Sequence, residues 1–136
     1  MNKKGFTLIE LMAVILILGV ILAIFIPNAI KILKENNIKI YKVKEETLVK
    51  SAKDYVMYNR DFEIPNGSSY AYITSNTLIK SGFGTKILDT TSGNECNAFV
   101  RISVNNVSGY NYEACLLCEE YKTNKDFCTS STFENI

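Results

Sequence analysis

The chain has 136 residues, which leaves room for one domain, and its formal net charge is +1 at pH 7. It contains no histidine and none of the glycine-rich nucleotide-binding, serine-hydrolase or zinc-protease motifs. The sequence therefore excludes the common enzyme classes, and we expect no catalytic residue, no cofactor and no metal site.

An apolar segment begins close to the N-terminus. Residues 11–30 carry no formal charge, and about 20 apolar residues in a helix are enough to cross the hydrocarbon core of a membrane. The segment is longer than the apolar part of a secretory signal, and no pair of small residues that would suit a signal peptidase follows it. Lys3 and Lys4 precede the segment and favour a cytoplasmic N-terminus. The sequence thus predicts a single-pass helix that stays in the cytoplasmic membrane.

One acid, Glu10, lies at the start of this apolar segment. An ionisable group inside hydrocarbon costs about 3 kcal/mol on insertion scales, so it is a functional-site hypothesis by default. The alternative is an anchor whose acidic side chain reaches the water at the headgroups.

The residues around Glu10 carry a family resemblance. The run Gly5-Phe6-Thr7-Leu8-Ile9-Glu10 resembles the N-terminus of type IV prepilins and of the pseudopilins of type II secretion and competence systems. The resemblance implies that a prepilin peptidase cuts after Gly5 and that the new N-terminal Phe6 is methylated. It also implies that Glu10 neutralises the N-terminal amine of a neighbouring subunit during assembly. Its specific part covers residues 3–30.

Two residues interrupt the helical pattern of the apolar segment. Pro27 lacks a backbone N–H, and its ring clashes with the preceding turn, which kinks or locally melts a helix. Gly19 is a second weak point. We expect a simple kink in the membrane helix at these positions. The resemblance implies in addition that the stretch between Gly19 and Pro27 loses helical order in an assembled filament.

The next segment, which we call the stem (residues 31–60), is predicted to continue the same helix to about Asn59. It is amphipathic and basic: residues 31–53 hold seven lysines against three glutamates, whereas residues 54–136 hold six basic and ten acidic residues. This asymmetry either helps subunits to stack or is an ordinary solvated helix face. The residues expected on the packed face are Ile38, Tyr41, Leu48, Ala52, Tyr55 and Val56.

The remaining part, which we call the head (residues 61–136), is predicted to be a small globular domain. A turn-rich break covers residues 60–69, a short helix residues 77–82 and a loop residues 84–94. Strands are predicted at residues 98–104 and 110–117, and the turn between them makes an antiparallel hairpin. The resemblance adds a leader peptide (residues 1–5) before a membrane or filament-core helix (residues 6–30). The whole predicts an α+β, pilin-like fold in which a long helix packs on a small antiparallel sheet with a disulfide-tied C-terminal loop.

Four cysteines, all in the last third of the chain, predict disulfides in an oxidising compartment. The Cys115-x-x-Cys118 spacing also suits zinc or redox chemistry, but no second pair of zinc ligands has a matching spacing. A hairpin centred on Val107 places Cys96 opposite Cys118. We therefore expect Cys96–Cys118 and Cys115–Cys128, although four cysteines allow three pairings.

These features predict a structural subunit of a type IV pilus or a related filament, held in the cytoplasmic membrane before assembly and at the cell surface afterwards. Its expected partners are copies of itself, other pilins, the peptidase and an inner-membrane assembly platform. One alternative is a minor pilin, or a pseudopilin of a type II secretion or competence DNA-uptake system. Another is a membrane-anchored binding module, whose tyrosines would stack on a ligand or on single-stranded DNA. The other interpretation of the tyrosines is the half-buried edge of the core.

Overall fold

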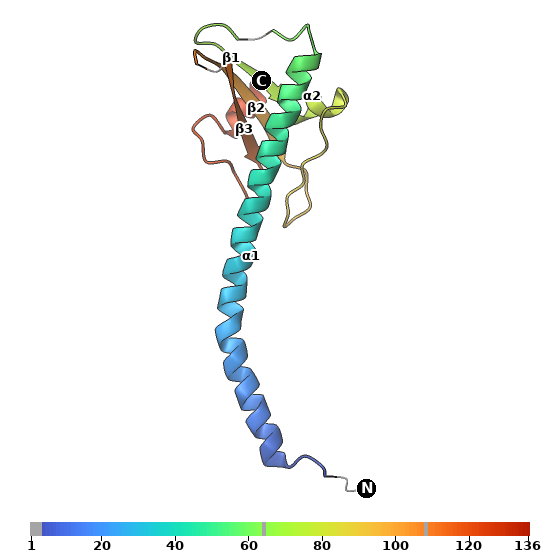
Figure 1. The fold of residues 1–136 in the computed structure, drawn as a ribbon, viewed down its shortest axis with the longest axis vertical. Helices are drawn as coiled ribbons and strands as arrows, with labels where there is room; N and C mark the ends of the chain where they lie inside the picture. The colour runs from blue at the N-terminus through green and yellow to red at the C-terminus, as the bar shows by residue number, and fades with distance from the viewer. Residues whose placement is uncertain (1–3, 64, 108) are drawn as a thin grey trace. The chain divides into compact units, whose positions relative to one another are not determined.

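The computed structural model describes residues 4–63, 65–107 and 109–136. The chain divides into two compact units, residues 1–37 and residues 38–136. The order of elements is helix α1 (Leu8–Tyr58), strand β1 (Tyr70–Thr74), helix α2 (Ser75–Lys80), strands β2 (Asn97–Asn105) and β3 (Gly109–Leu117) and helix α3 (Ser130–Glu134). Figure 1 shows them in chain order from blue to red. This confirms the expected α+β, pilin-like fold.

The first unit holds the N-terminal part of α1, whose described side chains are nearly all exposed. It contains the helical segment that is long enough and apolar enough to cross a membrane. The helix is assigned without a break through Gly19 and Pro27. Neither residue therefore melts the helix in this single chain, and the expected kink remains a prediction.

The sheet of the second unit is antiparallel, in the order β1-β2-β3. In the hairpin, Asn97 pairs with Leu117 and Asn105 with Gly109, so the pairing is centred on Val107 as the sequence predicts. Strand β1 pairs with the other edge of β2, with Tyr70 opposite Ser103. The sequence analysis did not predict β1.

Two hydrophobic clusters cover the two faces of this sheet, because alternate residues of a strand point to opposite sides. The first joins Tyr41, Leu48 and Ala52 of α1 to one face, where Val100 and Leu116 are buried. The second lies on the other face, between the sheet and the C-terminal segment; its members are Phe99, Cys115 and Cys128, with Tyr72, Leu117, Phe127 and Phe133 packed against them. The second half of α1 thus forms one wall of the second unit (Figure 1).

The predicted packed face of the stem needs one correction. Tyr41, Leu48 and Ala52 are buried and Tyr55 and Val56 are half-buried. Ile38, however, is 47% exposed. Along α1 the buried residues begin only at Tyr41. The helical spacing of apolar residues in the sequence therefore extends about one turn further towards the N-terminus than the part of α1 that is buried.

Gly84 allows a close approach between a loop and α2. A Cβ at this position would lie only 2.9 Å from Cβ of Leu78, which is fully buried. We expect Gly84→Ala to lower the free energy of unfolding by about 1–3 kcal/mol, because an added methyl forces packed groups apart. Urea denaturation of the detergent-solubilised chain measures this. Ser81→Ala, at an exposed position in the same turn, is the control, and an equal midpoint for both variants would contradict the expectation.

Candidate functional site

Helix α1 begins with a capping box formed by Thr7 and Glu10. The backbone N–H and the hydroxyl of Thr7 both donate to Oε2 of Glu10, each at 3.0 Å. In return, the backbone N–H of Glu10 donates to Oγ1 of Thr7 at 3.4 Å. This reciprocal pattern satisfies N–H groups that a helix start otherwise leaves without partners.

The capping box fixes how the carboxylate of Glu10 is presented. Both bonds from Thr7 go to Oε2, and a carboxylate has about four acceptor positions on its two oxygens. Within the described chain Oε1 accepts no hydrogen bond. One oxygen of Glu10 is therefore tied to its own chain, while the other is open to a cation from outside.

The proposed processing junction lies just before this helix. Gly5 and Phe6 belong to a segment without regular structure, and the side chain of Phe6 is 83% exposed. Cleavage between them would leave both members of the capping box in the mature chain. Gly5 and Phe6 are thus both exposed, and the capping box lies wholly on the C-terminal side of the bond between them.

A second polar centre, at Asp89 in the second unit, was not predicted from the sequence. Its Oδ1 accepts from the hydroxyl of Tyr41 at 2.9 Å and from the N–H groups of Thr91 and Ser92 at 2.8 and 3.3 Å. Its Oδ2 accepts from the N–H of Glu120 at 3.0 Å. These backbone N–H groups, first those of Glu120 and Thr91, hold the pKa of the Asp89 carboxyl well below its ordinary value, although burial acts in the opposite direction. Asp89 thereby links α1, its own loop and the segment after β3.

Glu45 makes a further link between α1 and the segment after β3. Its Oε1 accepts from the hydroxyl of Tyr121 at 2.9 Å and from the hydroxyl of Thr123. The ring of Tyr121 stacks on that of Tyr41, with centroids 4.3 Å apart. This favours the half-buried-core interpretation for Tyr121.

The alkaline stability of the protein should depend on Tyr121. Burial, with the bond to Glu45 and its charge, raises the pKa of Tyr121 from 10.0 to about 12. The unfolded chain therefore loses this proton first, and the contribution of Tyr121 is complete below pH 10 and lost as the pH rises towards about 12. We expect Tyr121→Phe to lose stability less steeply across this range in urea titrations. Parallel curves for the two proteins would contradict the assignment.

All four cysteines form disulfides: Cys96 is joined to Cys118 and Cys115 to Cys128. Cys96–Cys118 is the pair expected from the register of the hairpin, and Cys115–Cys128 is the pair expected from the two remaining cysteines. The sulfurs of Cys96 and Cys118 lie near the carboxylate of Asp89, in an arrangement that has the size of a metal site. Since both sulfurs are in a disulfide, neither is a thiolate that could bind a metal.

Comparisons with known proteins agree with this geometry. The family described as the prokaryotic N-terminal methylation motif matches residues 1–26. The chain is also 34% identical over 93 residues to the ComG operon protein 3 homolog of Bacillus licheniformis. The aligned region covers 64% of this chain and 92% of the relative. No solved structure matches the chain significantly. With the methylation motif at the start of an apolar helix and a relative matched over nearly its whole length, the chain belongs to the type IV prepilin-like family.

Proposed function

We propose that this protein is a prepilin that is cleaved after Gly5, methylated on Phe6 and assembled through α1 into a type IV filament. The observation that carries the proposal is the capping box, which places a carboxylate with one open oxygen at the start of an exposed apolar helix. The match of the methylation motif to residues 1–26 supports the cleavage and the modification. Residues 1–5 are then a leader, residues 6–30 the filament core, residues 31–60 the stem and residues 61–136 the head.

In the filament, Oε1 of Glu10 accepts a charge-assisted hydrogen bond from the cationic amine of Phe6 in a neighbouring copy. Two opposite charges attract far more strongly in a poorly hydrated environment than in water, and pairing offsets the cost of removing each from water. The contact also fixes the axial position of one helix against the next. Glu10 thus serves both the helix start and the subunit contact.

The similarity to a ComG operon protein 3 homolog favours a subunit of a competence filament over one of a secretion piston. Such a subunit waits in the cytoplasmic membrane, meets the peptidase and an assembly platform there, and reaches the cell surface as part of the polymer. Its abundance in sheared surface fibres distinguishes the two roles, because a piston subunit stays in the membrane fraction.

The test of processing uses two glycine substitutions. A Cβ at Gly5 or at Gly19 would meet no atom within 4 Å, so neither Gly5→Ala nor Gly19→Ala causes a clash. We expect Gly5→Ala to accumulate uncleaved in the membrane, while Gly19→Ala is cleaved like the wild type. Mass spectrometry of the mature wild-type protein should find methylated Phe6 as the first residue. Normal cleavage of Gly5→Ala, or a native protein that begins before Phe6, would overturn the proposal.

A further inference from the structure

The outer edge of β3 is open over residues 110–114. Alternate residues of an antiparallel strand direct their backbone groups to opposite sides. Leu116 donates its N–H to the hydroxyl of Thr123 and accepts the N–H of Thr123 at its carbonyl oxygen, so its backbone groups point away from β2. Those of Tyr110, Tyr112 and Ala114 point the same way, and no described residue bonds to them. This part of β3 therefore offers a free edge to a further strand.

Strand β1 has an open edge on the opposite side of the sheet. In β2, the residue opposite Leu116 and every second residue after it direct their backbone groups towards β1. Their partners in β1 are Ala71 and Ile73. The backbone groups of Tyr70 and Tyr72 therefore point outwards, and no bond from another described residue reaches them. Strand β1 holds no charged residue that would protect this edge from pairing.

A groove of about 420 Å³ lies between α1 and the open edge of β3. Its walls include Val49 of α1 and residues 112–114 of β3. Tyr112 and Ala114 belong to the sheet face that α1 covers, whereas Glu113 between them belongs to the other face. Because both faces contribute to the walls, the groove lies along the edge itself, where a further strand would pair.

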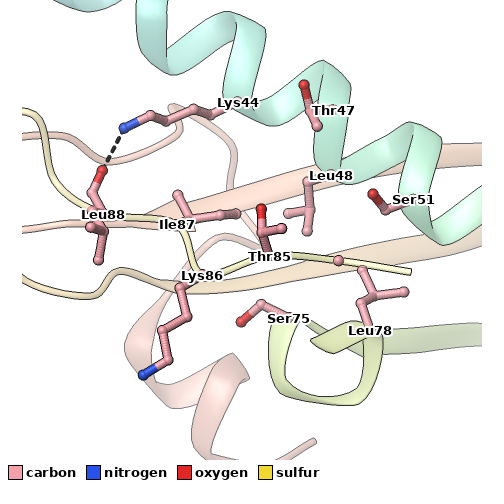
Figure 2. Close-up of a pocket in the computed structure, with 11 residues that line it drawn as sticks. Lys44, Thr47, Leu48, Ser51, Ser75, Leu78, Thr85, Lys86, Ile87 and Leu88 are labelled. Atoms are coloured by element: carbon pink, nitrogen blue, oxygen red, sulfur yellow. Dashed lines mark hydrogen bonds between the residues drawn. The ribbon is translucent and has the colours of Figure 1, made fainter. Parts of the chain in front are cut away.

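Two lysines of α1 that line the groove, Lys50 and Lys53, are available to a carboxylate from outside. Both are exposed, and neither forms an ion pair with another described residue. Lys44, on the same helix, is different: its Nζ donates to the carbonyl oxygen of Leu88, as the dashed line in Figure 2 shows.

The carboxylates of the groove are mostly engaged. Glu45 accepts hydrogen bonds from two hydroxyl groups. Glu113 is paired with two cations, those of Arg101 and Lys125. Among the described residues only Glu46 lines the groove with a carboxylate that has no such partner. Two available lysines against one available glutamate give the groove an excess of positive charge.

The segment that leads into β1 carries the complementary charge. Between Arg60 and β1 the chain holds Asp61 and Glu63 and no basic residue. Both acids are exposed, and neither is in an ion pair within the described part of the chain. Charge thus favours β1, with the segment before it, as the occupant of the groove at β3.

The symmetry of a filament selects the same occupant. Copies in a helical filament are related by rotation about one axis and translation along it, so neighbours turn the same face of the sheet inwards and their strands run the same way. Two β3 edges would need a twofold axis to meet. Since β1 and β3 are opposite edges of one sheet, a contact between them is heterologous and propagates into an open polymer.

We propose that the β1 edge of one copy pairs with the β3 edge of the next copy in the filament, as a parallel strand. Strands β1 and β3 run in the same direction because each is antiparallel to β2. The N–H of Tyr112 donates to the carbonyl oxygen of Tyr70 in the next copy, and the carbonyl oxygen of Tyr112 accepts the N–H of Tyr72. Lys53 meets Glu63 of the same neighbour. This inference rests on the proposed function, and it adds a head contact to the helix contact made by Glu10.

A proline at position 112 tests the strand pairing. Tyr112→Pro removes an N–H that takes no part in the ladder with β2, so the sheet within one copy keeps its bonds. Tyr112→Thr is the matched control, because it removes the same ring and keeps the N–H. We expect Tyr112→Pro to lower filament yield by at least about tenfold and Tyr112→Thr to stay within about threefold of the wild type. Urea midpoints and non-reducing peptide maps verify that both variants are folded.

A charge exchange tests the same contact without a change in the strand, and it decides if Tyr112→Pro does not fold. Lys53→Glu and Glu63→Lys should each lower the yield by about threefold or more, and the double variant should restore it. Lys39→Glu, an exposed position of α1 outside the groove, should assemble like the wild type.

Wild-type yield from a folded Tyr112→Pro, or charge variants that neither lower nor restore the yield in this way, would overturn the strand contact alone. Glu10→Gln would still block incorporation in that case. Wild-type incorporation of Glu10→Gln, or a wild-type chain that never polymerises, would instead overturn the proposed function.

Discussion

Replacing Glu10 by Gln should abolish incorporation into filaments while leaving the start of α1 intact. The oxygen of a glutamine side chain can still accept the N–H and the hydroxyl of Thr7, which now bond to Oε2 of Glu10. The charge, however, is lost, and the amine of the neighbouring Phe6 would enter the filament core without an anion. Because a buried charge without a partner is strongly destabilising, we expect incorporation to fall by at least about a hundredfold.

Thr7→Ala is the matched variant, because it removes the cap and keeps the carboxylate. Loss of an N-cap side chain typically costs about 1 kcal/mol of helix stability, so incorporation should fall by about fivefold at most. The measurement is the amount of each variant in sheared fibres when it is expressed beside the wild type, after cleavage has been verified. If Glu10→Gln assembles like the wild type, the charge pair is wrong. If Thr7→Ala fails as severely as Glu10→Gln, Glu10 acts mainly through the helix start.

The apolar N-terminal helix and the prepilin-like motif could be predicted from the sequence because each depends on residues that are close together along the chain. The capping box was also readable there, since Thr7 and Glu10 have the spacing of this motif before an apolar run. The two interpretations of Glu10, as an assembly residue and as an acid whose side chain reaches the headgroup water, both leave out its role in a helix cap. The structure adds that the carboxylate of Glu10 also caps the start of α1 by accepting hydrogen bonds from Thr7.

The hairpin was predictable because two β-rich runs flank a turn, and its register follows from the centre of that turn. Strand β1 was not predicted, although residues 70–74 are rich in aromatic and β-branched types. It is short, and its only described strand partner is β2, which begins more than twenty residues later in the chain. A pairing between segments so far apart leaves little trace in local sequence.

The Asp89 centre could not be predicted for the same reason. The donors to its carboxylate come from residues 41, 91, 92 and 120, and only the fold brings them together. In the sequence Asp89 stands in a run of loop-forming residues and resembles any solvated turn aspartate. Burial separates the two cases, since Asp89 is 3% exposed.

Asp89→Asn should destabilise the second unit more than Gly84→Ala does. The carboxylate accepts four hydrogen bonds with its two oxygens. An amide has only one acceptor oxygen. Its NH₂ group would face an N–H or a hydroxyl that donates to the carboxylate in the wild type. At least one buried donor then loses its acceptor, and α1 loses part of its link to the segment after β3. Urea denaturation at neutral pH measures this loss, with Asp126→Asn at an exposed position as the control.

Comparing the pH dependence of stability of the wild type and of Asp89→Asn separates the effect of the charge of Asp89 from the effect of its shape. The pKa of Asp89 in the folded chain lies below its ordinary value of 3.8, so the unfolded chain takes up this proton first as the pH falls. The stabilisation by Asp89 is therefore complete well above pH 3.8 and is lost progressively below it. We expect the difference in urea midpoint between wild type and Asp89→Asn to be largest near neutral pH and to shrink below pH 3.8. A difference that stays constant down to strongly acidic pH would show that packing, and not the ionised carboxylate, holds α1 to the sheet.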